Sequence, residues 1–182
     1  MDRYAMLTAF GQDRPGIVAA VAEGLFQLHC NIEDTCMTRL RGEFTMMVMV
    51  KLPSDLLSDH LASRIAQFTE PLGLTVLCRE LPPEAATSQP PSDIPAYMLS
   101  VYGADRPGIV AKIARTVADH DGNITDVNTR VIGPPERPVY VMLLEVLLPP
   151  EREPVHLERA LEALKSSLGV DVSLRTIEQL RF

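Results

Sequence analysis

A nine-residue segment that occurs twice constrains the fold of this chain more than any other feature of its sequence. Residues 11–19 read GQDRPGIVA, and residues 103–111 read GADRPGIVA. The same offset relates Asn31 to Asn123 further along the chain. Solenoid repeats recur every few tens of residues, so a repeat at this much longer distance indicates two copies of one small domain.

Hydrophobic periodicity predicts the element order β-α-β-β-α-β in each copy. In the first copy we expect strands over 4–10, 31–40, 44–52 and 74–81, a helix from an Asp13 N-cap to about His29 with Pro15 just inside it, and a second helix over 57–68. In the second copy we expect strands over 96–102, 123–132, 139–148 and 170–177, with helices around 109–117 and 157–168. This order is typical of the α+β class, here two ferredoxin-like domains, each a four-stranded antiparallel sheet with two helices on one face. The first and third strands of each copy are then central.

The stretch between the two copies has the composition of a linker. Residues 82–95 contain five prolines and few apolar side chains, which is typical of an extended and moderately stiff connection. We therefore expect a first domain at 1–81 and a second at 96–182. The copies differ at the second hairpin: Arg41-Gly42-Glu43 predicts a tight turn in the first copy, and four further residues, 133–136, are inserted in the second.

The third strands are apolar on both faces. Met46, Val48 and Val50 alternate with Met47 and Met49, and in the second copy Val141 and Leu143 alternate with Met142 and Leu144. A sheet with one face in water alternates apolar with polar residues instead. We therefore expect the helix-free face to be covered, either by the other domain or by a second chain in a homodimer.

Charge and composition exclude several classes of function. The chain has 17 Lys and Arg against 24 Asp and Glu, a net charge of −7, and no basic run, which argues against direct binding of nucleic acid. No apolar stretch is long enough to span a membrane, and the first residues lack the apolar region of a signal peptide. We expect a cytoplasmic protein.

The cysteines and histidines do not form a recognisable catalytic or metal site. Cys30 and Cys36 with His29 allow a metal or redox interpretation, but no paired C-x-x-C spacing occurs and small apolar packing is the more common role. His29 and His120 fall near helix C-termini, where histidine commonly caps. Neither copy offers a nucleophile with its base, so we expect no catalytic residue, metal or cofactor.

The repeated turn has the chemistry to bind a free amino acid. Unpaired N–H groups at a helix start favour a carboxylate, and glycine at that point lets a ligand approach the backbone. An aspartate in the turn suits an ammonium group, and an asparagine at the next strand both donates and accepts hydrogen bonds. These groups are Asp13, Gly16 and Asn31 in the first copy and Asp105, Gly108 and Asn123 in the second.

Helix capping is the alternative explanation for the same residues. Asp-x-Pro-Gly is common at helix starts, and asparagine is common in turns after helices. For one copy alone, capping is the more common role. The repetition of these residues in two copies whose helix surfaces have diverged favours binding.

The element order, together with Gly-x-Asp-Arg-Pro-Gly-Ile-Val and Asn-Ile in both copies, resembles the ACT domain, a small regulatory module that senses amino acids. Residues 30–34 and 42–45 are similar to the tandem-ACT group of glycine cleavage system transcriptional repressors. The resemblance implies amino-acid binding at the interface of paired domains, through the loop after the first strand and the start of the second. Carried over, it names Gly11, Asp13, Gly16 and Asn31, and Gly103, Asp105, Gly108 and Asn123.

The hypotheses that follow from the sequence differ in class. The first is a tandem amino-acid sensor, with glycine as the preferred ligand by resemblance, which acts on transcription through a protein partner. The second is a regulatory interaction module of an amino-acid metabolic enzyme, and the third is an interaction module that has lost its ligand. The start of the motif also resembles formyltetrahydrofolate deformylase, but the formyl-hydrolysing domain that would follow is absent from this sequence.

Overall fold

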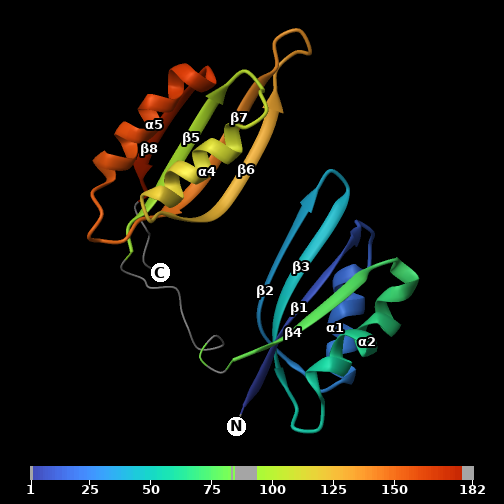
Figure 1. Ribbon diagram of the computed structural model, residues 1–182. Helices are drawn as coiled ribbons and strands as arrows, with labels where there is room; N and C mark the ends of the chain where they lie inside the picture. Colours follow the sequence, from blue (N-terminus) through green and yellow to red (C-terminus); the bar gives the residue numbers. More distant parts are fainter. Residues whose placement is uncertain (1, 83, 85–93, 178–182) are drawn as a thin grey trace. The chain divides into compact units, whose positions relative to one another are not determined.

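The computed structural model describes residues 2–82, 84 and 94–177, and the chain divides into two compact units, Met1–Pro90 and Pro91–Phe182. The units are shown in Figure 1 and are treated separately below. The predicted linker over 82–95 lies largely outside the described residues and stays a prediction, as do the domain limits that depend on it.

The first unit forms one antiparallel sheet with two helices on one face (Figure 1). The strands lie in the order β2-β3-β1-β4, so the first and third strands are central, as predicted. Every strand pair within the sheet is antiparallel. The elements are β1 (Arg3–Gln12), α1 (Ile17–Gln27), β2 (Asn31–Leu40), β3 (Glu43–Leu52), α2 (Ser58–Thr69), the short 3-10 helix η1 (Glu70–Leu72) and β4 (Thr75–Leu81).

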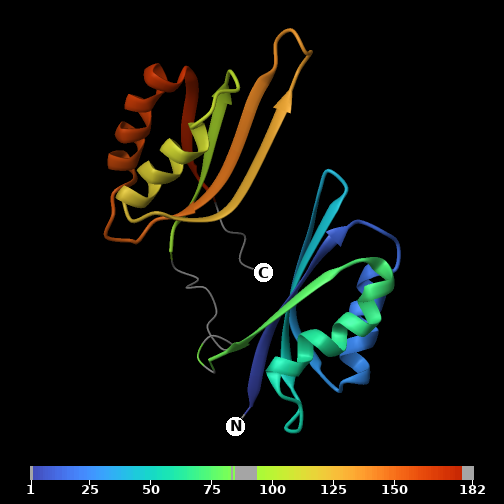
Figure 2. The same ribbon diagram turned by 45° about the vertical axis from the view of Figure 1, so that its right-hand side comes forward.

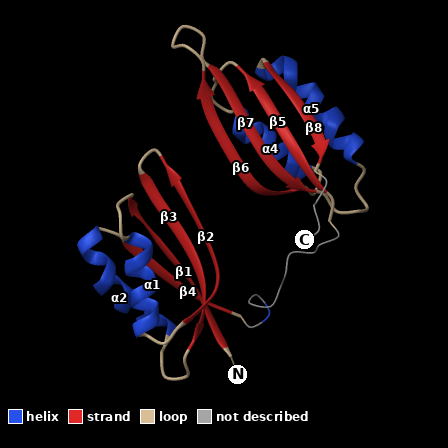
Figure 3. Cartoon of the chain, turned by 180° about the vertical axis from the view of Figure 1, so that it is seen from behind, coloured by secondary structure: helices blue, strands red, loops and turns tan. Residues whose placement is uncertain are grey.

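The second unit repeats this architecture. Its strand order is β6-β7-β5-β8, and Figure 3 shows both helices behind the sheet in the view from the other side. The elements are β5 (Ala96–Gly103), α4 (Ile109–Asp119), β6 (Asn123–Ile132), β7 (Val139–Leu147), α5 (Pro154–Leu168) and β8 (Val170–Thr176). The predicted pair of βαββαβ domains is confirmed.

Each core lies between the helices and one face of the sheet. On β1 and β3 every second side chain is buried, as the two-residue period of a strand requires. These side chains pack against apolar side chains of α1 and α2. Figure 2 shows the two helices on the same side of the sheet. The fully buried members include Leu7, Val48, Val21, Leu25, Leu61 and Ile65 in the first unit, and Leu99, Leu144, Ile113, Val117, Leu157 and Leu161 in the second.

The helix-free faces carry exposed apolar side chains within the described residues. Met47 is 49% exposed and Phe10 40% exposed in the first unit, and Tyr102 is 44% exposed in the second. The third strand of the first unit therefore has apolar side chains on both faces, as predicted. That another domain or chain covers this face stays a prediction.

The outer strands β2 and β6 are open at their free edges among the described residues. All ten residues of β2 are exposed, and β6 is nearly as open. Each strand has one irregularity in its pairing, between Ile32 and Asp34 in β2 and between Ile124 and Asp126 in β6. The two bulges fall at equivalent places in the repeat.

The first hairpin has the tight turn that its sequence predicts. Arg41 and Gly42 both adopt positive φ angles, 50° and 87°, which a two-residue turn of type I′ requires. The second hairpin is longer, and inside it the Arg137 N–H donates to the carbonyl oxygen of Pro134. The predicted difference between the copies is confirmed.

The predicted N-caps are wrong. Helix α1 begins at Ile17, and its N-cap is Gly16 in the left-handed conformation, with φ 95° and ψ −7°. Helix α4 likewise begins after Gly108, with φ 95° and ψ −6°, and no side chain caps either helix. Asp13, Asp105 and Pro15 lie before the helices, because the glycine turns the chain where an aspartate cap was expected.

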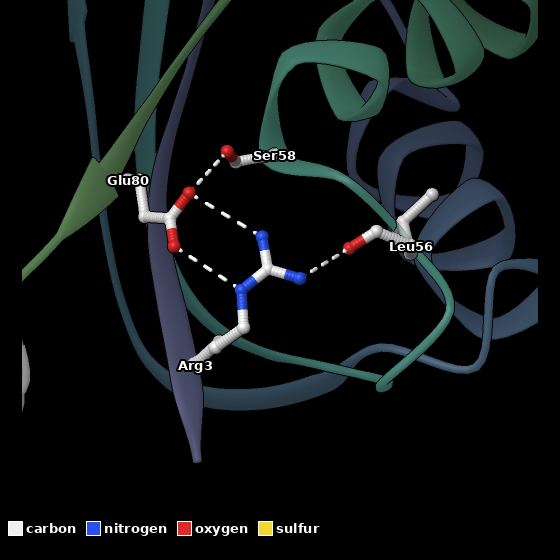
Figure 4. A network of polar contacts seen from close by, with 4 residues as sticks. All are labelled: Arg3, Leu56, Ser58 and Glu80. Carbon is white, nitrogen blue, oxygen red and sulfur yellow. Dashed lines mark hydrogen bonds and ion pairs between the residues drawn. The ribbon is translucent and has the colours of Figure 1, made fainter. Parts of the chain in front are cut away.

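A polar network joins the start of β1 to β4 and to the segment before α2 (Figure 4). Arg3 Nε and Nη2 donate to the two carboxylate oxygens of Glu80 at 3.2 and 3.3 Å. Arg3 Nη1 donates to the Leu56 carbonyl at 3.0 Å, and the Ser58 hydroxyl donates to Glu80. These hydrogen bonds lower the pKa of Glu80 below its ordinary value of 4.5.

Candidate functional site

The first glycine of each repeated turn lies against the backbone of a neighbouring loop. A Cβ atom on Gly103 would lie 2.7 Å from the Gly169 carbonyl oxygen and 2.9 Å from Val170 Cα. On Gly11 it would lie 3.0 Å from the Gly73 carbonyl oxygen. Both glycines therefore have a packing role that the sequence did not reveal, and their predicted contact with a ligand stays a prediction.

The second glycine of each turn has open space around it. A Cβ atom on Gly16 or Gly108 would meet no heavy atom within 4 Å, so only the positive φ of 95° demands glycine there. The N–H groups of the first helical turn have no side-chain cap and lie at the positive end of the helix dipole. This backbone can receive a carboxylate in both copies.

Asp13 is already engaged within its own domain. Its Oδ2 lies 3.0 Å from Arg39 Nη1, in an ion pair where the side chains of Arg39 and Asp13 are 67% and 30% exposed. The Asp13 N–H donates to the Gly42 carbonyl at 2.8 Å, which ties the turn to the hairpin between β2 and β3. An ammonium group at Asp13 has to share this carboxylate with a guanidinium.

Asp105 is exposed and makes no ion pair with the residues that the structure describes. Its charge acts on Tyr140 of β7. Burial raises the pKa of the Tyr140 phenol above its ordinary value of 10, and the Asp105 carboxylate adds to the rise. The second copy therefore presents a negative charge without a counter-ion beside its turn.

The predicted asparagine lies at the far end of the sheet in the first unit. Asn31 pairs with Lys51, whereas Gln12, beside the turn, pairs with Glu43 at the other end of β3. Eight residues of β3 separate the two levels, which is about 26 Å at the rise of a strand. Asn31 Nδ2 donates to Glu33 Oε1 at 2.8 Å.

The second unit separates the same groups in the same way. Asn123 pairs with Leu147, and Gly103 pairs with Tyr140, seven residues away along β7, which is about 23 Å. Each domain thus brings its glycines and aspartate together at one end and places its asparagine at the other. Within one copy they are not a single site.

Sequence reasoning missed the surroundings of Asp13. A shallow hollow of about 540 Å³ is lined by Asp13, Thr38, Arg39, Arg41 and others at the end of β2. Arg39 reaches this place because β2 pairs with β3, which also pairs with β1. No local pattern indicates such a contact, since it depends on the register of three strands.

The cysteines and His120, which the sequence also offered as candidates, lie in environments that a purely structural role explains. Burial raises the pKa of the Cys30 thiol to about 11 and also raises that of Cys78, while Cys36 is exposed. His120 Nδ1 lies 2.8 Å from the Thr116 carbonyl oxygen at the end of α4. Within 2–82, 84 and 94–177, no three His, Cys, Asp or Glu side chains are grouped to hold a metal ion, and no helix is long and apolar enough to cross a membrane.

Comparison with known proteins relates most of the chain to one domain family. The model of the ACT domain family matches residues 3–79 and again 97–175. A glycine cleavage system transcriptional repressor of Escherichia coli (strain K12) is 25% identical over 177 residues, which cover 96% of this chain and 90% of the repressor.

Solved structures share the fold over nearly the full length. An unknown protein from Galdieria sulphuraria superposes with a TM-score of 0.77 at 25% identity, covering 98% of this chain and 100% of the other. A putative glycine cleavage system transcriptional repressor superposes with a TM-score of 0.67 at 20% identity, covering 98% and 99%. With both halves matched, this chain belongs to the ACT domain family as a tandem of two ACT domains.

Proposed function

We propose that this protein binds a free amino acid and passes its ligand state to a protein partner as a regulator. The observation that carries the proposal is the shared geometry of the two turns. Each has an uncapped helix start behind a left-handed glycine, with open space above it and an aspartate in the turn before it. Membership of the ACT domain family supports the same conclusion.

The chemistry assigns one charged group of the ligand to each part of the turn. The ligand carboxylate accepts hydrogen bonds from the first N–H groups of α4 or α1, next to Gly108 or Gly16. The ammonium group lies against the carboxylate of Asp105 or Asp13. A charge-assisted hydrogen bond of this kind contributes about 1.5–3 kcal/mol to binding.

A ligand that also contacts an asparagine needs a second ACT domain. The distance from turn to asparagine within one domain exceeds 20 Å by the strand spacing given above, several times the length of an amino acid. The asparagine at the start of β2 or β6 therefore belongs to a paired copy, from the same chain or from a second chain in a homodimer. This arrangement would link ligand binding to domain pairing.

The proposed cellular role rests on likeness to the Escherichia coli protein, which is named a glycine cleavage system transcriptional repressor. On that likeness we propose glycine as the ligand, the cytoplasm as the location, and control of transcription through a partner protein. The net charge of −7 disfavours direct contact with DNA. Regulation of an amino-acid metabolic enzyme through protein contact is the alternative.

A thermal-shift series tests the proposal directly. The full chain is melted in the presence of each of the twenty amino acids, with glycine first. A ligand at about 100 times its dissociation constant adds roughly 2.7 kcal/mol to stability, which raises the melting temperature by several degrees. If none of the twenty changes the melting temperature, the protein is an interaction module without an amino-acid ligand.

A further inference from the structure

The two turns are surrounded by different charges, and the difference lies at one position of the outer strand. In the first unit Arg39 of β2 and Gly11 of β1 both pair with Phe44 of β3. In the second unit Val131 of β6 and Gly103 of β5 both pair with Tyr140 of β7. Arg39 and Val131 therefore occupy equivalent positions beside the two turns.

Arg39 supplies the first turn with a cation from within the domain. Its guanidinium lies 3.0 Å from Asp13 Oδ2, where the proposed ligand would place its ammonium group. Arg41 lines the same hollow, so two cationic side chains surround a single aspartate. An amino acid that enters this turn meets a carboxylate that is already paired and a net positive surface around it.

Among residues 94–177, no Lys or Arg forms an ion pair with Asp105 as Arg39 does with Asp13. Arg130, the neighbour of Val131, pairs with Val141 and lines a hollow with Leu143, on the side of β7 that does not carry the core residues Met142 and Leu144. Successive strand residues point to opposite faces, so Arg130 is directed away from the position of Val131.

Arg106, the arginine of the second turn, is directed toward the end of α5. The Arg106 guanidinium lies beside Gly169, because a Cβ atom on that glycine would come within 3.3 Å of Arg106 Nη1. Gly169 follows the last residue of α5, and a cation is favoured at the C-terminus of a helix. Arg14 of the first turn instead donates to Gln12 Oε1 at 2.8 Å.

We infer that the two ACT domains are unequal receptors, and that the identity of residue 39 or 131 sets the difference. Arg39 serves as a built-in counter-ion of Asp13, so the first turn binds the ammonium group of an amino acid more weakly. The second turn, with Val131 in that place, leaves Asp105 free and is the amino-acid site. This inference rests on the proposed function and specifies which copy binds the amino acid.

Exchange of the two residues tests the inference with matched variants. Arg39→Val gives the first copy the side chain of the second, and Val131→Arg does the reverse. Arg39 and Val131 are both exposed, the latter at 48%, so neither change disturbs a core. Binding of each of the twenty amino acids, glycine first, is measured by calorimetry on the full chain of the parent and of both variants.

The site that responds is identified by labelling the protein with ¹⁵N-glycine. The chain has 10 glycines, so few amide signals appear, and those of Gly16 and Gly108 report on the two turns separately. We expect the ligand to shift the Gly108 signal of the parent at a lower concentration than the Gly16 signal. In Arg39→Val the affinity reported by the Gly16 signal should be about two- to fivefold higher than in the parent.

The outcomes separate this inference from the proposed function. Two equal sites in the parent, or an Arg39→Val variant that gains no binding at Gly16, would overturn the role of Arg39 and leave amino-acid binding intact. A Val131→Arg variant that binds as tightly as the parent would do the same. If no amino acid binds the parent or either variant, the proposed function fails, and the inference fails with it.

Discussion

Replacement of Gly103 by alanine should destabilise the second ACT domain through a backbone clash. The added Cβ atom would lie 2.7 Å from the Gly169 carbonyl oxygen and 2.9 Å from Val170 Cα. Neither atom is the end of a flexible side chain, so β5 and the loop before β8 have to separate. Overpacking of this kind costs about 1–3 kcal/mol. Alanine also restricts the unfolded chain, which returns about 0.4–1 kcal/mol.

The expected net loss is therefore about 1 kcal/mol in the free energy of unfolding. For a domain of this size that corresponds to a fall in melting temperature of about 4–8 °C. Gly11→Ala is the equivalent change in the first domain, where the Cβ contacts are looser, at 3.0 Å, but the φ of 158° is itself strained for alanine. We expect a loss of similar size, in the first domain.

The aromatic content of the chain provides the assay. It has no tryptophan and four tyrosines, three of which, Tyr97, Tyr102 and Tyr140, lie in the second unit. Tyrosine fluorescence during urea unfolding therefore reports mainly on the second domain, while circular dichroism reports on both. If Gly103→Ala unfolds within about 0.5 kcal/mol of the parent, a typical effect for surface changes, the close approach of the backbones is refuted.

Three further predictions concern charge and reactivity. Asp105→Asn should weaken amino-acid binding about ten- to a hundredfold in calorimetry. It should leave the melting temperature unchanged, because Asp105 caps no helix. A parallel loss of stability would contradict this. The ionised form of Glu80 stabilises the first domain at a pH above 4.5, the ordinary pKa of the group, and this contribution is lost as the pH falls through the lowered pKa of the folded state. Urea titrations from pH 6 to 3 should therefore show a steeper loss of unfolding free energy for the parent than for Glu80→Gln. Iodoacetamide at about pH 8 should label Cys36 first, since burial raises the pKa of the Cys30 and Cys78 thiols, and peptide mapping that finds either of these labelled first would refute their burial.

The sequence was sufficient for the fold because local patterns and the repeat agreed. Strand β2 and the turn at Arg41 and Gly42 lie where periodicity and turn chemistry predict them. The helix starts were misplaced because aspartate and glycine compete for the same capping position, and the sequence does not say which conformation Gly16 adopts. The backbone φ angle decided between them.

The candidate site was only partly predictable, for a geometric reason. Asp13 and Gly16 are near in sequence and remain near in space. Asn31 follows a helix that returns along the full length of the sheet, so its distance from Asp13 depends on strand register, which residue spacing does not encode. The ion pair of Asp13 with Arg39 joins the ends of β1 and β2 and is equally invisible before pairing is known.

The open edges of β2 and β6 affect how this protein behaves at high concentration. The free edge of a ten-residue strand is a template for open-ended growth by strand addition, which leads to aggregates. The bulges after Ile32 and Ile124 interrupt that template, and the charges of Glu33 and Asp34 repel an identical strand in parallel register. A strand that adds to either edge has to match the bulge, which favours a limited assembly over an indefinite fibre.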